Sequence, residues 1–242
     1  MNIENHEIHV NGLPVQIVRK DIKNLHLGVY PPNGRVRVAA PLAVNDGAVR
    51  LAVIGKIGWI KKKKAAFLAQ ARQSGREMVS GESHYYLGRR YRLRLILSAG
   101  PTRIALKNQA TIEMRIRPEA DARMRLEILN QWYRERLREL VPPLLMKWEK
   151  ILGVHSSNWG IKKMKTKWGS CNPDARRIWL NLELAKKPVR CLEYIIAHEL
   201  IHLIERNHNN RFIALMDKHL PSWRRHRQEL NSAPLAKETW SY

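Results

Sequence analysis

Three histidines and one glutamate near the C-terminal end have the spacing of a metal-dependent hydrolytic site. His198 and His202 are four residues apart in the apolar segment "IIAHELIHLI", so on a helix their imidazoles project from one face. That spacing lets two imidazoles reach one Zn²⁺ ion at about 2.0–2.1 Å. Polar groups buried in such a segment without partners would each cost several kcal/mol, and a metal ion would satisfy them.

Glu199 has the position of a catalytic base. It follows His198 and is turned roughly 100° around the helix, so it can face a metal-bound water without binding the metal itself. This is the His-Glu-x-x-His arrangement of zinc hydrolases. Zinc lowers the pKa of its bound water to about 7, and Glu199 can take the proton and deliver it to the leaving group. A purely structural site would have no role for this glutamate.

The third metal ligand has two candidates. Glu205 would stay on the same face if the helix continued, whereas His208 requires the helix to stop and the chain to turn back. The segment "ERNHNN" supplies turn-forming residues, and Asn207 can adopt the left-handed conformation that ends helices. A catalytic zinc site has three protein ligands and one open position. We favour His208 and expect one zinc ion, although a three-histidine site accepts several divalent ions.

The charge of the chain indicates an anionic partner. Among 242 residues, 44 Lys and Arg face 21 Asp and Glu, a formal net charge of +23, which suggests nucleic acid first. The basic segments are "KKKK" (61–64), "IKKMKTK" (161–167) and "WRRHRQ" (223–228). Nearby tryptophans suit stacking on single-stranded nucleic acid. Alternatively, the cations hold the phosphates of a nucleotide substrate.

The sequence lacks a signal peptide, a membrane span and a disulfide framework, and these features bear on the cellular location. The N-terminal residues lack a basic-then-apolar signal pattern, and no apolar run approaches the roughly 18 residues of a membrane span. Cys171 and Cys191 do not form a disulfide framework. We therefore expect a cytoplasmic protein, and the sequence does not define its oligomeric state.

The elements that must position the site suggest an α+β fold. Residues 1–118 read as a β-rich region with one helix, and residues 119–242 as a more helical metal-binding region, although the two can form one continuous domain. No internal repeat is evident. A hairpin turning at residues 172–174 precedes the motif helix. In it, Asn181 lies opposite a leucine face and could bond a substrate backbone along an exposed strand edge. Trp168 in "WGSC" could help to form the substrate cleft.

Four segments carry a family resemblance. They are "TKWGSCN", "IWLNLEL", "EYIIAHELIHL" and "NHNNRF", between residues 166 and 212. They resemble the successive motifs of the YgjP-like predicted zinc metallopeptidases, which are related to the SprT and Wss zinc proteases. The resemblance implies His198, His202 and His208 as metal ligands. It departs at Asn209, where the family often has Ser, and at Ile213, where it often has Trp.

We therefore expect a zincin-like half, with its active-site helix on a small antiparallel sheet, behind a β-rich half. The expected function is a zinc metallopeptidase that acts on peptides or proteins, near nucleic acid as the SprT-like relatives do. One alternative is a metal-dependent nucleoside triphosphate pyrophosphatase or phosphohydrolase, because metal-bound hydroxide can also attack a phosphoanhydride. A second alternative is a non-catalytic nucleic-acid-binding protein with a structural zinc.

Overall fold

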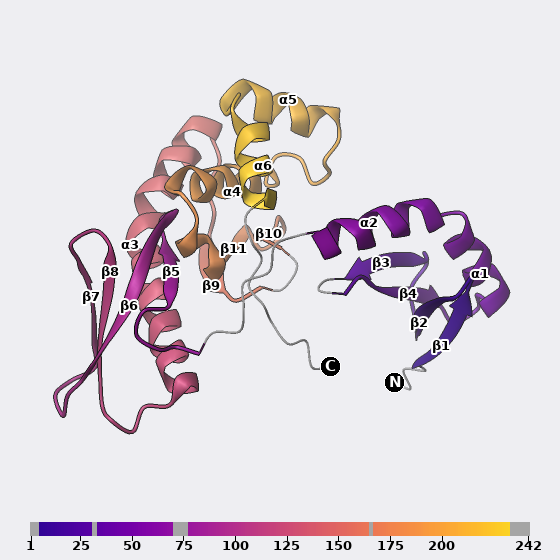
Figure 1. Cartoon of the computed structure of the whole chain (residues 1–242). Coiled ribbons are helices and arrows are strands. Elements are labelled where there is room, and N and C mark those ends of the chain that lie inside the picture. The colour runs from indigo at the N-terminus through magenta and orange to yellow at the C-terminus, as the bar shows by residue number, and fades with distance from the viewer. Residues whose placement is uncertain (1–4, 31–32, 70–76, 165–166, 233–242) are drawn as a thin grey trace. The chain divides into compact units, whose positions relative to one another are not determined.

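The chain combines helices with three small sheets, which confirms the α+β class (Figure 1). The computed structural model describes the backbone of residues 5–30, 33–69, 77–164 and 167–232. Two compact units divide between Ser74 and Gly75. The sequence pattern placed a boundary at residue 118 instead. Residues on both sides of 118 share one hydrophobic core, in which Leu93 and Met114 pack with Leu129 and Leu137.

The N-terminal unit is a four-stranded sheet followed by two helices. The strands are β1 (Asn5–Val10), β2 (Leu13–Lys20), β3 (His26–Tyr30) and β4 (Arg35–Pro41). Asn45 caps helix α1 (Asp46–Ile54) by accepting a hydrogen bond from the Ala48 amide at 2.9 Å. Instead of the single helix expected from the sequence, the chain breaks after Ile54 and resumes as α2 (Ile57–Ala69). Alternating valines of β2 and β4 form the core with both helices.

The C-terminal unit opens with a second four-stranded sheet and a long helix. Its strands are β5 (Ser83–Tyr86), β6 (Arg89–Leu97), β7 (Arg103–Lys107) and β8 (Thr111–Ile116), followed by α3 (Ala122–Leu152). Antiparallel pairing joins β5 to β6 and β7 to β8, the latter through a turn at Asn108 with a φ of 49°. Tyr133 of α3 donates a hydrogen bond to the Tyr85 carbonyl at 2.7 Å, which ties the helix to the sheet.

The two four-stranded sheets have the same topology. In each, the first and second strands pair antiparallel, the second and fourth pair parallel, and the fourth and third pair antiparallel. The strand orders are β1-β2-β4-β3 and β5-β6-β8-β7, and a helix follows the last strand in both cases. The backbone thus repeats a ββββα pattern that the sequence does not reveal, because different side chains satisfy the same alternation.

Helix α3 runs through a pair of prolines, although such a pair is typical of the end of one helix or the start of the next. Pro142 and Pro143 lie inside the helix, which starts after the capping Asp121 and ends at Gly153 with a φ of 64°. Each proline removes a backbone hydrogen bond. The buried residues on both sides of the pair, Leu137 and Leu145 among them, belong to one continuous core face. Packing along that face outweighs the local cost.

The metal-binding region is built on a third sheet. Its strands are β9 (Asn158–Lys162), β10 (Gly169–Asn172) and β11 (Arg177–Asn181), in the order β10-β11-β9. The β10–β11 hairpin is antiparallel as expected, but β9 pairs parallel to β11, so the sheet is mixed. A 3-10 helix, η1 (Leu182–Lys186), follows β11 directly. Helices α4 (Val189–Ile201), α5 (Asn210–His219) and α6 (Trp223–Ser232) complete the unit.

Candidate active site

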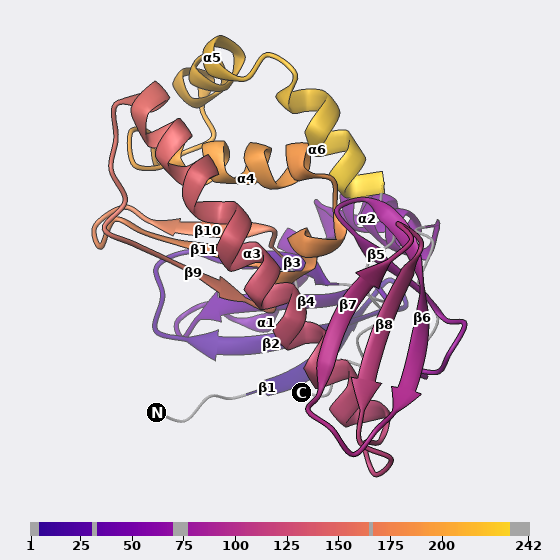
Figure 2. The same cartoon turned by 90° about the vertical axis from the view of Figure 1, so that its left-hand side faces the viewer.

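Helix α4 lies over β10 and β11, with α3 alongside (Figure 2). It is apolar on most of its surface because neighbours cover nearly all of it: Ile196, Leu200 and Ile201 are fully buried. His198 is half-buried on this helix, and His202 is the residue at which the helix ends. A buried helix that packs on β10 and β11 therefore holds both histidines of the motif.

The chain turns back after helix α4, as it must if His208 is the third metal ligand. His202 caps the helix in an ordinary right-handed conformation, and Asn207 is not among the residues with a positive φ. The turn is instead held by polar contacts. The Nδ1–H of His202 donates to the Glu205 carbonyl at 3.0 Å, and Asn209 caps α5 by accepting from the Phe212 amide. These bonds bring His208 back over α4.

Three imidazoles meet at this point. The candidate ligand atoms of His198, His202 and His208 all lie within 4.8 Å of one another. The Nε2 atoms of His198 and His208 are 3.0 Å apart. Because its Nδ1 is already bonded to a carbonyl, His202 presents Nε2. Burial and the two neighbouring histidines lower the pKa of His198 to about 3, so at neutral pH its ring is uncharged and has a free lone pair.

This cluster fits a single transition-metal ion. Ligand nitrogens at about 2.0–2.1 Å from a tetrahedral ion lie roughly 3.3 Å from one another, close to the 3.0 Å between His198 and His208. Glu205, the alternative third ligand, is directed elsewhere: its carboxylate accepts a hydrogen bond from the Asn207 amide and approaches Arg211 at 4.0 Å. Its contribution is the carbonyl that orients His202.

A phenylalanine that the sequence analysis did not single out supports all three rings. The ring centroid of Phe212 on α5 lies 4.9 Å from that of His198, 4.8 Å from that of His202 and 4.7 Å from that of His208. Phe212 is only 2 % exposed. Its position four residues after His208, on the apolar side of a short helix, was the available signal, but such a residue is equally typical of an ordinary core.

Glu199 is buried beside strand β10. It is 5 % exposed, and its carboxylate lies against Gly169, where an added Cβ would meet Oε1 at 2.5 Å. Burial raises the pKa of Glu199 to about 8, and the positive charge of Lys167 acts in the opposite direction. The same burial, together with Glu199, raises the pKa of the Cys171 thiol to about 11. The site thus holds a carboxyl group that can carry a proton at neutral pH.

Asn181 differs from its expected role. Its Nδ2 donates to the carbonyls of Met164 and Lys167, and its Oδ1 accepts from the amides of Met164 and Glu183. The side chain, 4 % exposed, has therefore no donor or acceptor left for a substrate. Strand β11 is also the central strand of its sheet. These facts indicate that Asn181 shapes the loop before β10 in place of the substrate contact expected from the sequence.

Trp168 lies at the end of that loop, half-buried. Its carbonyl accepts a hydrogen bond from the Asn181 amide at 2.9 Å, and the Lys187 ammonium lies 5.4 Å from its ring centroid. Lys187 is itself buried, which lowers its pKa. Trp168 is not part of the histidine cluster. It immediately precedes Gly169, so it positions the strand that contacts Glu199.

The family of the chain follows from comparison with known proteins. The model of the YgjP-like metallopeptidase domain matches residues 23–233. The chain belongs to the YgjP-like family. This confirms the resemblance seen in the motifs and places the domain among the metallopeptidases. Membership of a metallopeptidase family implies that the protein binds a divalent metal, typically zinc. Comparison with curated proteins found no match.

The matched region extends beyond the histidine motif. It begins in the N-terminal unit and includes the second four-stranded sheet, α3 and all of the C-terminal helices. Among the described helices, none is long and apolar enough to cross a membrane.

Proposed function

We propose that this protein is a zinc-dependent peptidase in which His198, His202 and His208 hold the metal and Glu199 transfers protons. The observation that carries the proposal is the convergence of three imidazoles next to a buried glutamate that makes no ion pair within the described residues. A structural zinc site would be closed by four protein ligands, whereas the described residues supply three at this place. The fourth position is then available for chemistry.

When bound, a zinc ion would lower the pKa of a coordinated water and polarise a substrate carbonyl. The role of Glu199 is to accept a proton at its carboxylate and to pass it to the leaving amine. Burial raises the pKa of Glu199 to about 8 without a metal, and the positive charge of a bound zinc ion would lower that pKa so that the carboxylate could accept a proton. The burial that raises the pKa also keeps bulk water from the proton.

Strand β10 is the better candidate for binding the substrate backbone. It lies at the edge of its sheet, whereas β11 is flanked on both sides. Gly169 at its start touches Glu199. An extended peptide added along β10 would form backbone hydrogen bonds and pass close to the catalytic carboxylate. This replaces the contact with Asn181 that the sequence suggested.

Hydrolysis of a nucleoside triphosphate is the second candidate, favoured by cations near the site. Lys167 and Arg227 act electrostatically on Glu199 and His198, respectively, and such cations can bind phosphate oxygens. The same metal and glutamate would serve either reaction, since both are hydrolyses that need an activated water. The third candidate is a non-catalytic nucleic-acid-binding protein with a structural zinc, in which Glu199 would have no role.

One experiment separates these readings. Wild type and Glu199→Gln, each loaded with zinc and with metal content measured, are offered unfolded protein in one arm and a panel of nucleoside triphosphates in the other. We expect peptide fragments from wild type alone, with a loss of about 10²–10⁴-fold in the variant and unchanged zinc content. Phosphate or pyrophosphate release from wild type alone would support the nucleotide reading. Equal behaviour of the two proteins in both arms would contradict an enzymatic role.

A further inference from the structure

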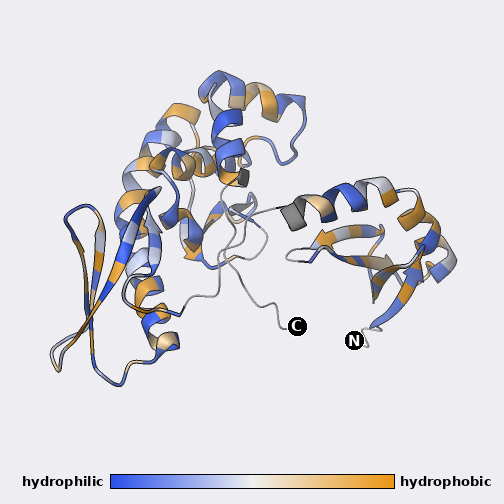
Figure 3. Cartoon of the chain, viewed as in Figure 1, coloured by the Kyte–Doolittle hydropathy of each residue, from blue (hydrophilic) through white to orange (hydrophobic). Residues whose placement is uncertain are grey.

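The sheet β5–β8 has one face packed on a core and one face turned outward. Tyr91 and Leu93 of β6, with Ile112 and Met114 of β8, are buried in the core that includes α3. Because side chains alternate along a strand, the residues between them point to the opposite face. Hydrophilic and hydrophobic residues alternate along these strands in Figure 3. The intervening residues therefore form a second face of the sheet, directed away from the core.

That face is strongly basic. Six exposed cations lie on it: Arg90, Arg92, Arg94, Arg103, Lys107 and Arg115. Glu113 is the single carboxylate among the outward residues of these strands. In the described part of the chain, none of the six cations forms an ion pair. We call these six residues and the surface between them the basic sheet face.

Two of these arginines oppose each other directly. The register of β7 and β8 pairs Arg103 with Arg115, and like charges at directly opposite positions destabilise a sheet. Glu113 lies two residues from Arg115 on the same face, but neither arginine forms an ion pair within the described residues. A polyanion bound to the basic sheet face would relieve the repulsion, so the cost to the free protein is consistent with a binding surface.

The chemistry of the face suits a phosphate backbone. Arg90, Arg92 and Arg94 follow one another at alternate positions of β6, about 6.6–6.8 Å apart, and neighbouring strands lie about 4.8 Å away. Five of the six cations are arginines, whose planar fork can bind phosphate oxygens with two hydrogen bonds. The outward residues of the described strands include no exposed large apolar side chain, which a membrane-binding surface would use for insertion.

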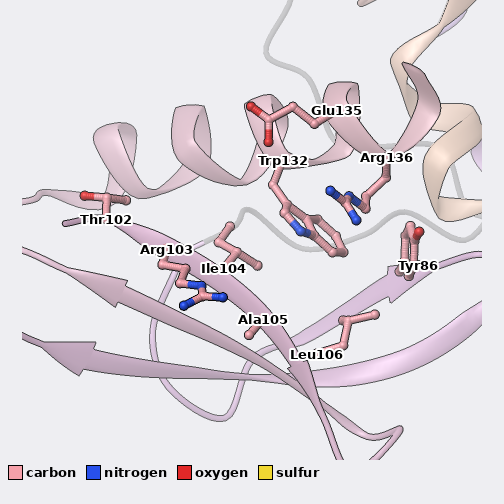
Figure 4. A pocket seen from close by; sticks show the side chains of 9 residues that line it. All are labelled: Tyr86, Thr102, Arg103, Ile104, Ala105, Leu106, Trp132, Glu135 and Arg136. Atoms are coloured by element: carbon pink, nitrogen blue, oxygen red, sulfur yellow. The ribbon is translucent and has the colours of Figure 1, made fainter. Parts of the chain in front are cut away.

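A pocket at the edge of the sheet favours a single strand over a duplex. It lies between β7 and α3, has a volume of about 550 Å³, and is lined by Tyr86, Trp132, Glu135, Arg136 and residues 102–106 (Figure 4). Arg103 belongs to both the pocket and the basic sheet face. The rings of Trp132 and Tyr86 are 8 % and 9 % exposed, so they offer a narrow aromatic wall beside the guanidinium groups of Arg103 and Arg136. Such a wall suits an unstacked base, and a duplex offers no such base.

We propose that the basic sheet face, with the pocket at its β7 edge, binds single-stranded nucleic acid through its phosphate backbone. The proposal goes beyond the peptidase activity and does not depend on it, because none of these residues belongs to the histidine cluster. It also places the nucleic acid elsewhere than on the three basic segments that stand out in the sequence.

The test compares two triple variants of the full chain that lose the same charge. Arg92→Gln/Arg94→Gln/Arg115→Gln alters the basic sheet face, and Lys61→Gln/Lys62→Gln/Lys63→Gln alters exposed lysines of α2. Binding of a labelled single-stranded oligonucleotide is measured by fluorescence anisotropy between 50 and 300 mM salt. We expect the arginine variant to bind about 100-fold more weakly at ~0.1 M salt, with the slope of log K against log salt reduced by about 2. The lysine variant should change far less.

Further arms make each outcome decisive. Thermal unfolding of both variants should match wild type or exceed it for the arginine variant, since it removes the repulsion at Arg115. A duplex of the same length should bind more weakly than the single strand, and equal binding would overturn the role of the pocket. Equal losses in the two triple variants would overturn the assignment to this face. Preferential binding to vesicles containing anionic lipid, lost in the arginine variant, would overturn nucleic acid as the partner.

Discussion

Gly169 and Glu199 touch so closely that only a hydrogen atom fits between them. A Cβ at position 169 would lie 2.5 Å from Oε1 of Glu199 and 2.9 Å from its Cδ. The first residue of β10 and the second residue of the histidine motif are thus fitted to each other, although 30 residues separate them. The absence of a side chain at Gly169 gives the carboxylate its place.

Gly169→Ala should therefore reduce activity without removing the metal. The methyl group must displace the Glu199 carboxylate, and a misplacement of about 1 Å at a reacting group can cost about 10²-fold. We expect a fall of that order in kcat, with unchanged zinc content measured by atomic absorption. Gly58→Ala is the matched control, because nothing lies within 4 Å of a Cβ there. Normal turnover in Gly169→Ala would show that the carboxylate position is unimportant.

The third ligand can be decided by metal content. His208→Ala should lose most of the bound zinc, since its Nε2 lies 3.0 Å from that of His198. Glu205→Gln should keep a full equivalent, because the carboxylate is outside the cluster and the carbonyl that orients His202 is retained. The measurement is zinc per chain after dialysis against a weak chelator. The reverse pattern would make Glu205 the ligand.

Removal of the metal should lower thermal stability. An ion that binds only the folded state stabilises it in proportion to the logarithm of its concentration over Kd, about 2.7 kcal/mol at 100 times Kd. We expect chelated protein to unfold at a lower Tm, and zinc to restore the wild-type value. In His208→Ala, zinc should produce little shift. An identical Tm with and without zinc would argue against a folded-state site.

A substitution of Phe212 should change the metal affinity of the site more than it changes the stability of the fold. Its ring packs against all three imidazoles, and residues that orient ligands typically contribute 10–100-fold to metal affinity. Phe212→Leu, which stays apolar, should weaken zinc binding by about tenfold in a competition titration. Met216→Leu on the same helix is the control, being a buried apolar side chain of the same core that has no aromatic ring. An equal loss of zinc affinity in the two variants would show that Phe212 acts only as an ordinary core residue.

Asn181→Ala should destabilise the protein without a specific effect on substrate binding. It removes three hydrogen bonds to Met164 and Lys167 before β10 and one from the Glu183 amide after β11, and leaves these backbone groups without their partner. The cost should be about 2–3 kcal/mol, read from the urea midpoint of unfolding. Below the unfolding transition, KM should stay near the wild-type value. A raised KM at unchanged stability would restore the substrate contact first expected from the sequence.

The sequence by itself determined the features that depend on local spacing. A four-residue interval on an apolar helix placed His198 and His202 on one face, and the motifs around them identified the YgjP-like family. The hairpin at residues 172–174 was predicted because turn residues interrupt alternating strands. Each of these inferences needs only neighbours within a few residues, so periodicity and turn chemistry suffice.

Only the tertiary structure decided the relationships between distant segments. The contact of Gly169 with Glu199 and the packing of Phe212 on three histidines join separate elements, and no local pattern encodes them. The prolines at 142 and 143 are typical of a helix end or start, but the shared core on both sides of them kept α3 continuous. Asn181 looked free on a strand and proved fully bonded. Burial and partners arise from the whole fold, which is why these outcomes could not be obtained from spacing alone.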